Sequence, residues 1–317
     1  QIPMVIGRRN WRTVSRLIEG FQPDVVALQG QIFDITIMAG LIATRRGVPT
    51  SMTVHSAIWH DNRFLNAILA VGDTLLSRVL LRRMTDSWIG VDDRTIQHIR
   101  QRYDRNPVTI PICVRRGVFS NGDPDVARSK YSISGSPVIA SIGHVVPVRD
   151  RKALVRALPA VLERHPDLEV VVAGRVADES FLALAEELGV ERNLRVVGPV
   201  PHSDISHLLA AADMEVHDLQ GFGLGIASLE PIDAGIPIVA YARDNNIPDV
   251  SLRAYCRDAF LENNEPSSIS SCVIRLLDDP EFRNRVTAEQ KQLLEDVYYL
   301  DVVTEKYLSE FRRIIAG

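Results

Sequence analysis

The stretch from Gln220 to Pro237, QGFGLGIASLEPIDAGIP, decides the fold class of this chain. Gly221, Gly223 and Gly225 permit a close backbone approach and positive φ, and an apolar helical pattern follows them. A glycine-rich loop that leads into a helix directs backbone N–H groups and the positive end of the helix dipole at one point. The order therefore predicts a strand, a loop and a helix that together can hold a diphosphate.

Glu230 lies about one turn into this predicted helix. A carboxylate at that place can accept two hydrogen bonds from a ribose diol, as the acidic residue of dinucleotide sites does. A glycine-rich loop before a helix is a weak signal by itself and is more typical of a tight turn. The order of strand, GFGLG, helix with Glu, Ala-Gly, Ile-Pro and strand is more specific.

Short apolar runs alternate with helical patterns on both sides of this stretch, which predicts βα units and mostly parallel sheets. Strands are predicted at residues 24–29, 50–55, 87–91, 108–110, 137–143, 169–174, 194–197, 214–217, 236–241 and 259–261. Helices are predicted at residues 11–21, 36–46, 65–84, 93–103, 152–165, 180–188, 202–211, 226–234, 267–277, 280–294 and 302–315. The chain is thus expected to be an α/β protein with two doubly wound, Rossmann-like domains.

Residues 115–136 lose the apolar rhythm in RRGVFSNGDPDVARSKYSISGS, and we predict a linker there. It would separate an N-terminal domain at residues 1–114 from a second domain at 137–295. The segment 296–317 is predicted to be a helix that crosses back to the first domain. Because the first domain opens into a helix rather than a strand, we expect one or two βα units to precede Gln1.

Composition sets further expectations for this chain of 317 residues, of which 46% are hydrophobic and 24% charged. No apolar run approaches the roughly 20 residues of a membrane span, and no signal-peptide order is present, so a cytoplasmic protein is expected. Residues 1–120 hold 16 Arg and 9 acidic residues (+7), whereas the rest holds 20 Lys and Arg and 31 acidic residues (−11). The basic half fits either an anionic membrane surface or acceptor, or ordinary solvated arginines.

The loop and helix resemble the signature of the family-four retaining glycosyltransferases, which reads EGFGL, then a Glu, then AAGxPVVA. Here the text is QGFGL, Glu230 and DAGIPIVA. The segments PDVVALQG (23–30), GVPTSMTVHS (47–56) and SIGHVVPVRDRKALVRAL (141–158) are also similar to family segments. The resemblance implies a GT-B fold, in which an acceptor-side and a nucleotide-sugar-binding domain face one cleft. It also implies that a sugar is transferred from a nucleotide sugar to an acceptor, with retention of the configuration at the anomeric carbon.

The resemblance assigns roles to residues of both domains. Those implied near the reacting sugar are His55, Asp218 and Gln220. Those implied in donor binding are Gly143, His144, Arg149, Arg151, Arg175, Gly221, Phe222, Gly223, Leu224, Gly225 and Glu230. Within this set, Glu230 would bind ribose, and Arg149 or Arg151 the diphosphate.

The chain departs from the family at three places. Gln220 replaces the first acidic residue, and His144 and Asp150 stand where the family has Arg and Lys. An alternative function is therefore a non-catalytic nucleotide-sugar-binding protein or an inactive fragment, and an epimerase of the same fold is a third possibility.

The expected partners are a UDP-, GDP- or ADP-linked sugar and a saccharide, lipid or small-molecule acceptor. Cofactors and metal ions are not expected, because the sequence has no Asp-x-Asp after a strand and its eight histidines lack ligand spacing. Nucleic acid is not expected either, because the basic residues are not interleaved with aromatic ones and the pI is about 6.1.

Overall fold

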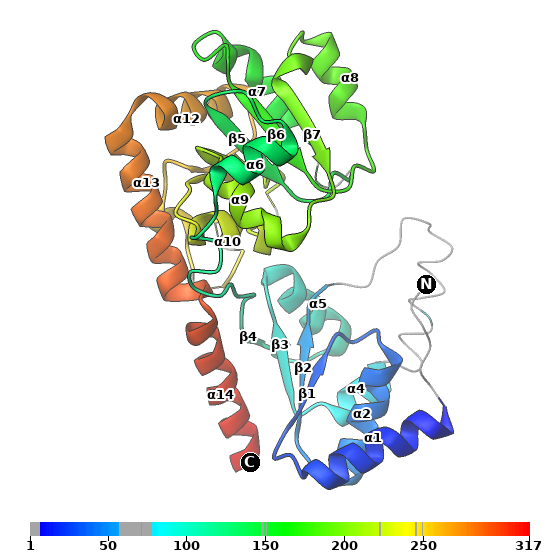
Figure 1. Cartoon of the computed structure of the whole chain (residues 1–317). Coiled ribbons are helices and arrows are strands. Elements are labelled where there is room, and N and C mark those ends of the chain that lie inside the picture. Colours follow the sequence, from blue (N-terminus) through cyan, green and yellow to red (C-terminus); the bar gives the residue numbers. More distant parts are fainter. Residues whose placement is uncertain are drawn as a thin grey trace. The chain divides into compact units, whose positions relative to one another are not determined.

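A computed structural model describes residues 7–56, 71, 78–146, 149, 151–221, 223–244, 246–248 and 250–317. Phe222, Asp150 and most of the predicted helix 65–84 lie outside these residues. The chain forms two compact units (Figure 1). Unit 1 consists of Gln1–Pro111 with Val303–Gly317, and unit 2 of Ile112–Val302.

Unit 1 is built on a parallel four-stranded sheet in the order β1-β2-β3-β4. Its strands are β1 (Val26–Gln29), β2 (Thr50–Val54), β3 (Ser87–Gly90) and β4 (Val108–Thr109). Its helices are α1 (Arg8–Phe21), α2 (Asp34–Arg45), α4 (Arg78–Met84), α5 (Asp93–Tyr103) and most of α14 (Leu300–Ala316). Every residue of β2 and β3 is buried, as expected for inner strands of a parallel sheet.

Helix α5 shows how local sequence fixes a boundary. The Asp92 carboxylate accepts a hydrogen bond from Thr95 N at 2.8 Å, and Thr95 Oγ1 accepts one from Asp92 N at 3.1 Å. This capping box satisfies two N–H groups at the helix start. The helix ends at Tyr103, whose ring stacks on Trp88 of β3 with centroids 4.6 Å apart. The helix at 93–103 was predicted and is confirmed.

Unit 2 is built on a parallel six-stranded sheet in the order β10-β9-β8-β5-β6-β7. Its strands are β5 (Val138–Ile142), β6 (Glu169–Ala173), β7 (Leu194–Gly198), β8 (Met214–Val216), β9 (Ile238–Tyr241) and β10 (Phe260–Leu261). The first strand in the chain, β5, pairs with both β6 and β8. The chain thus turns to opposite sides of β5, which makes the β5–β8 junction the topological switch point of a doubly wound sheet.

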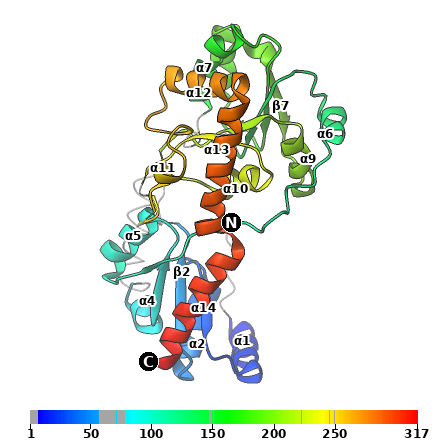
Figure 2. The same cartoon turned by 90° about the vertical axis from the view of Figure 1, so that its left-hand side faces the viewer.

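Helices cover this second sheet. They are α6 (Pro124–Tyr131), α7 (Lys152–Leu162), α8 (Ser180–Glu187), α9 (Ile205–Ala210), α10 (Ile226–Asp233), α11 (Leu252–Tyr255), α12 (Pro266–Asp278) and α13 (Pro280–Leu293). Short 3-10 turns, η3 (Glu191–Asn193) and η4 (His202–Asp204), precede β7 and α9, and a π-helical turn, η5 (Leu294–Tyr298), follows α13. Helices α7 and α12 pack side by side, as Figure 2 shows.

The segment 115–136 differs from the sequence expectation, because it contains helix α6 rather than only irregular chain. Asp123 caps this helix by accepting a hydrogen bond from Asp125 N at 3.0 Å, and Pro124 opens it. Helix α6 packs on α9, yet Ala127 is its one fully buried residue. A helix with so narrow a buried face gives almost no apolar period, which is why the sequence pattern missed it.

The search for membrane-spanning helices covers the described part of the chain. None of the helices there has both the length and the apolar character needed to cross a bilayer.

Candidate functional site

The switch point of unit 2 gathers several of the predicted donor-binding residues. Gly143 directly follows β5, and His217 and Asp218 directly follow β8. Ligands of open α/β sheets bind beyond the carboxyl ends of the strands at such a junction. The chain therefore brings Gly143 and Asp218, 75 residues apart in sequence, to one edge of the sheet.

Two arginines supply positive charge at this edge. The Arg151 side chain is buried, with 2% of the residue exposed, and its Nη2 donates to Gly143 O at 3.2 Å. Arg149 is half-buried, and its Nη1 lies 3.6 Å from where a Cβ on Gly143 would be. Its Nη2 lies 3.7 Å from the corresponding position on Gly225. The Arg149 guanidinium is thus held between the turn after β5 and the start of α10.

Asp218 binds the start of helix α10. Its Oδ2 accepts hydrogen bonds from Gly225 N at 3.1 Å and from Ser228 Oγ at 2.5 Å. Burial raises the pKa of Asp218. The charge of His217, these hydrogen bonds and the charge of Arg149 together lower it by more, so the pKa of Asp218 lies below its usual value. Asp218 is consequently an anion that occupies one of the free N–H groups of the helix start.

Glu215 and His217 complete the cluster, although neither was predicted to be a site residue. The His217 side chain is fully buried; its Nδ1 is hydrogen-bonded to Glu215 Oε1, and its Nε2 lies 3.3 Å from Asp218 Oδ1. Burial lowers the pKa of His217, but the two carboxylates raise it by more. A signal was present in the sequence: an acidic residue inside the apolar strand β8 requires a buried partner.

The glycine-rich loop adopts the conformations that were predicted for two of its three glycines. Gly221 has φ 73° and Gly223 has φ 101°, whereas Gly225 has φ −87° and is extended, so the expectation of positive φ is wrong for Gly225. A Cβ on Gly221 would lie 2.9 Å from the Tyr241 ring. Leu224, predicted as a donor contact, is buried in the hydrophobic core of unit 2.

Glu230 lies on α10 with 8% of the residue exposed. Its Oε1 is 3.3 Å from Nε2 of His202, whose side chain is 74% exposed. Burial raises the pKa of Glu230, and the neighbouring His202 and the charge of His217 offset this only in part. Glu230 is thus a buried carboxylate whose side-chain partner is an exposed histidine.

His144 and Arg175 meet at the ends of β5 and β6. Arg175 N donates to His144 Nδ1 at 3.2 Å, and both side chains are exposed. Gly174 directly follows β6, and a Cβ there would come within 2.3 Å of Gly143 O. This edge therefore carries His144 and Arg175 next to the Gly143 turn.

The remaining predicted residues are placed as follows. His55 belongs to unit 1, follows β2, and its Nε2 lies 2.8 Å from Gln29 Oε1. Burial lowers the pKa of His55, which favours the neutral imidazole. Gln220 is half-buried in the loop after β8. Phe222 lies outside the described residues.

Comparison with known proteins assigns the family. The model of the glycosyl transferases group 1 matches residues 124–293, which is more than half of the chain. The chain belongs to the glycosyl transferases group 1. The predicted resemblance is thereby confirmed.

Two curated relatives of the group 1 glycosyltransferases come from Corynebacterium glutamicum. One is a D-inositol 3-phosphate glycosyltransferase of strain R, 26% identical over 206 residues, or 60% of this chain and 49% of the relative. The other is a GDP-mannose-dependent monoacylated alpha-(1-6)-phosphatidylinositol monomannoside mannosyltransferase, 28% identical over 296 residues, or 87% of this chain and 73% of the relative. The chain spans about half the length of the first curated relatives that it matches.

Solved glycosyltransferase structures agree on the fold. The crystal structure of Anabaena Alr3699/HepE in complex with UDP matches with a TM-score of 0.73 and 13% identity, covering 98% of this chain and 85% of that one. Together with the two parallel sheets of four and six strands, this shows the GT-B fold that was predicted.

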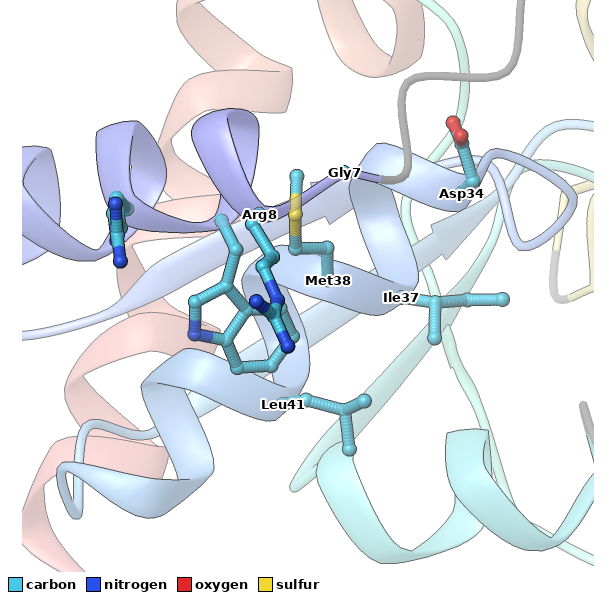
Figure 3. Close-up of a pocket in the computed structure, with 8 residues that line it drawn as sticks. Gly7, Arg8, Asp34, Ile37, Met38 and Leu41 are labelled. Atoms are coloured by element: carbon cyan, nitrogen blue, oxygen red, sulfur yellow. The ribbon is translucent and has the colours of Figure 1, made fainter.

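Unit 1 carries a pocket of its own, of about 720 Å³ (Figure 3). It lies between α1 and α2, and Figure 3 shows Ile37, Met38 and Leu41 of α2 on its wall, with Arg8 on the α1 side. Trp11 also lines the pocket, and its ring lies 5.2 Å from the Arg45 guanidinium carbon. None of these residues was predicted to form a site.

Proposed function

We propose that this protein is a retaining glycosyltransferase that moves a sugar from a nucleotide-sugar donor to an acceptor, with the donor diphosphate bound at the β5–β8 junction. One observation carries the proposal: the Arg149 guanidinium lies between the Gly143 turn and Gly225 at the switch point of the sheet. A guanidinium binds phosphate oxygens through paired N–H groups. A second cation, Arg151, is buried near Arg149 and adds positive charge to the site.

The chemical roles follow from charge. When the glycosidic bond breaks, negative charge grows on the leaving diphosphate, and a preorganised Arg149 stabilises it. Glu230 would accept hydrogen bonds from the ribose diol in place of the exposed His202. Retention is ascribed to attack on the same face of the sugar, with the leaving phosphate accepting the acceptor's proton. Arginines of the chain would balance the negative charge of the leaving diphosphate, so no metal ion would be needed.

The remaining assignments rest on the family resemblance. Gln220 and Asp218 would address the donor sugar, and His55 the reaction zone. Asp218 would then also position the start of α10, because its Oδ2 accepts hydrogen bonds from Gly225 N and Ser228 Oγ. His144 and Arg175 would border the nucleotide.

Titration calorimetry with UDP, GDP and ADP tests the proposal. The curated relative uses GDP-mannose and the structural neighbour binds UDP, so both bases are informative. We expect one nucleotide to bind, and Arg149→Ala to weaken it by about 2 kcal/mol, or roughly 30-fold. Arg156→Ala, which removes an exposed arginine from α7, is the control. Equal affinities of the two variants would contradict the diphosphate assignment.

Turnover separates the two candidate functions. Hydrolysis of the matching nucleotide sugar, or its transfer to an acceptor, indicates an enzyme. The anomeric configuration of the product then tests retention, and the same rate in EDTA tests metal independence. Tight binding without turnover would instead favour the nucleotide-sugar-binding protein, for which Gln220 in place of an acidic residue is the supporting observation.

We further propose a cytoplasmic protein with peripheral membrane contact through α1. Four arginines, Arg8, Arg9, Arg12 and Arg16, are exposed on this helix, together with the apolar side chains of Leu17 and Phe21. Cations and apolar groups on one helix favour anionic lipid headgroups. Cosedimentation with vesicles of phosphatidylglycerol but not of phosphatidylcholine is expected, and equal recovery with both would contradict this contact.

A further inference from the structure

The fully buried His217 is enclosed by carboxylates at the end of β8. Glu215 bonds its Nδ1, and Asp218 Oδ1 lies 3.3 Å from its Nε2. A neutral imidazole carries one N–H, so one of its nitrogens would direct a lone pair at a carboxylate oxygen. An imidazolium carries an N–H on both nitrogens, so it can hydrogen-bond Glu215 through Nδ1 and place a positive charge at ion-pair distance from Asp218. The geometry therefore favours the charged form.

Charged groups of other elements also face this imidazole. Arg151, from the segment before α7, disfavours a second positive charge, and Glu230 of α10 favours it. Glu215 and Asp218 are the carboxyl groups next to the ring; burial raises the pKa of Glu215, and the charges of His217 and Arg151 offset this only in part. Without a cation between them, the two carboxylates would have only Arg149 and Arg151 to balance their negative charge.

The ring also lies close to the Gly143 turn, where the diphosphate is proposed to bind. His217 Cδ2 is 3.7 Å from where a Cβ on Gly143 would be. Through Asp218, the imidazole is connected to Gly225 N and to Ser228 at the start of α10. His217 thus lies beside the Gly143 turn and is linked to Gly225 through Asp218.

We propose that His217 is a positioning residue of the donor site, an imidazolium that neutralises the adjacent carboxylates and holds Asp218 against α10, so that the site accepts a diphosphate. This inference rests on the proposed function. His217 has no exposed side-chain surface and acts through its neighbours rather than on the substrate. Loss of the imidazolium proton would remove one positive charge from the diphosphate site. The affinity for a diphosphate therefore falls as pH rises through the titration of His217. Affinity for the bare nucleoside does not.

Two measurements test this role. Imidazole ¹⁵N chemical shifts of labelled wild-type protein, with the His217 signals assigned by their loss in His217→Gln, are expected to show both nitrogens protonated at pH 7. Calorimetry is expected to show that His217→Gln binds the nucleoside diphosphate about tenfold more weakly, with no change for the nucleoside. His165→Gln, which alters a histidine paired with Asp278 elsewhere in unit 2, is the matched control and is expected to bind as wild type.

A second variant separates charge from shape. His217→Gln combined with Asp218→Asn removes one cation and one anion, and Asn still offers an oxygen to Gly225 N and Ser228. We expect this pair to recover most of the lost affinity. A neutral His217 in wild-type spectra, or equal diphosphate affinity of wild type and His217→Gln, overturns the inference. Absence of nucleotide binding by the wild type would instead overturn the proposed function, and the spectra would still report the charge of His217.

Discussion

The Tyr299 phenol donates a hydrogen bond to Asp233 Oδ1 at 3.0 Å, within the interior of unit 2. Asp233 also accepts hydrogen bonds from Gly117 N at 2.8 Å and from Phe119 N at 3.3 Å. Because α10 ends at Asp233, this carboxylate ties the helix that bears Glu230 to two segments distant in the chain. Buried acceptors with several donors contribute more than a single surface contact.

Replacing Asp233 with asparagine is therefore expected to destabilise unit 2. The amide NH₂ would face N–H donors in place of an oxygen, which costs about 2 kcal/mol of the free energy of unfolding. Tyr299→Phe removes only one donor and is expected to cost about 1 kcal/mol. Urea denaturation followed by circular dichroism measures both. If Asp233→Asn lowers the free energy of unfolding by no more than Tyr299→Phe does, the hydrogen bonds from the backbone N–H groups of residues 117 and 119 do not contribute to stability.

Gly174 is expected to tolerate no side chain. Its φ is +140°, and a Cβ would come within 2.3 Å of Gly143 O, so Gly174→Ala must displace the turn that borders Arg149. We expect a loss of stability of about 3 kcal/mol or more and loss of nucleotide binding. Gly189→Ala is the matched control, because Gly189 has φ +67° but open space around its Cα.

The control isolates backbone strain from the clash. Gly189→Ala is expected to cost about 1 kcal/mol from its left-handed conformation and to leave nucleotide affinity unchanged. Thermal unfolding and calorimetry of the two variants check this. Equal losses in both would mean that the contact with Gly143 has no influence on the site.

Local signals explain how much of the fold was predictable. Alternating apolar and polar runs located the ten strands within a few residues, and Asp92 at a cap position marked the start of α5. Gly221 and Gly223 were expected to adopt positive φ, and they do. These features depend on neighbours in the chain, so the sequence reveals them directly.

The parts that escaped prediction depend on contacts across the fold. Arg151 has the letter pattern of a charged helix start but is buried against Gly143. The bond between Asp218 and the start of α10 arises only when the loop after β8 folds back. The sequence contains Glu215 and His217, but not the fact that β8 is an inner strand whose end is closed to water.

Glu310 of α14 offers a pH-dependent test in unit 1. Its carboxylate accepts hydrogen bonds from Ser87 of β3 and from Arg313. The Arg313 hydrogen bond lowers the pKa of Glu310, burial opposes this, and the Ser87 hydrogen bond lowers it further, for a net decrease. A lowered pKa gives stability that is present above the unfolded value of about 4.3 and is lost as pH falls through the folded value.

We therefore expect Glu310→Gln to be less stable than wild type at pH 7 by about 1–2 kcal/mol, and the difference to shrink as pH falls below about 4. Glu305→Gln, at an exposed position of the same helix, is expected to change little at either pH. Urea titrations at pH 7 and pH 3.5 measure the differences. A difference that stays constant with pH would show that the ionised form of Glu310 is not what holds Ser87.

The assignment of Glu230 to the ribose predicts a pH dependence of nucleotide binding, and the pKa of Glu230 is raised where that of Glu310 is lowered. Because burial raises the pKa of Glu230, its carboxylate takes up a proton at a higher pH than an ordinary glutamate and then has fewer lone pairs for a diol. Preference for a ribonucleoside diphosphate over its 2′,3′-dideoxy analogue should thus decline as pH falls through that raised value. Glu230→Gln is expected to lower the ribonucleotide affinity about tenfold and to leave the dideoxy affinity unchanged.

His202 sharpens this test, because its Nε2 is the side-chain partner of Glu230, 3.3 Å from Oε1, and partly offsets the increase in pKa. Removing it in His202→Ala should move the decline in ribose preference to higher pH, while at pH 8 the preference stays intact or increases because no protein group competes with the diol. Calorimetric titrations of both nucleotides between pH 5 and pH 8 give the two curves. If Glu230→Gln keeps the ribose preference of the wild type, or if His202→Ala moves the decline to lower pH, Glu230 is not the ribose acceptor.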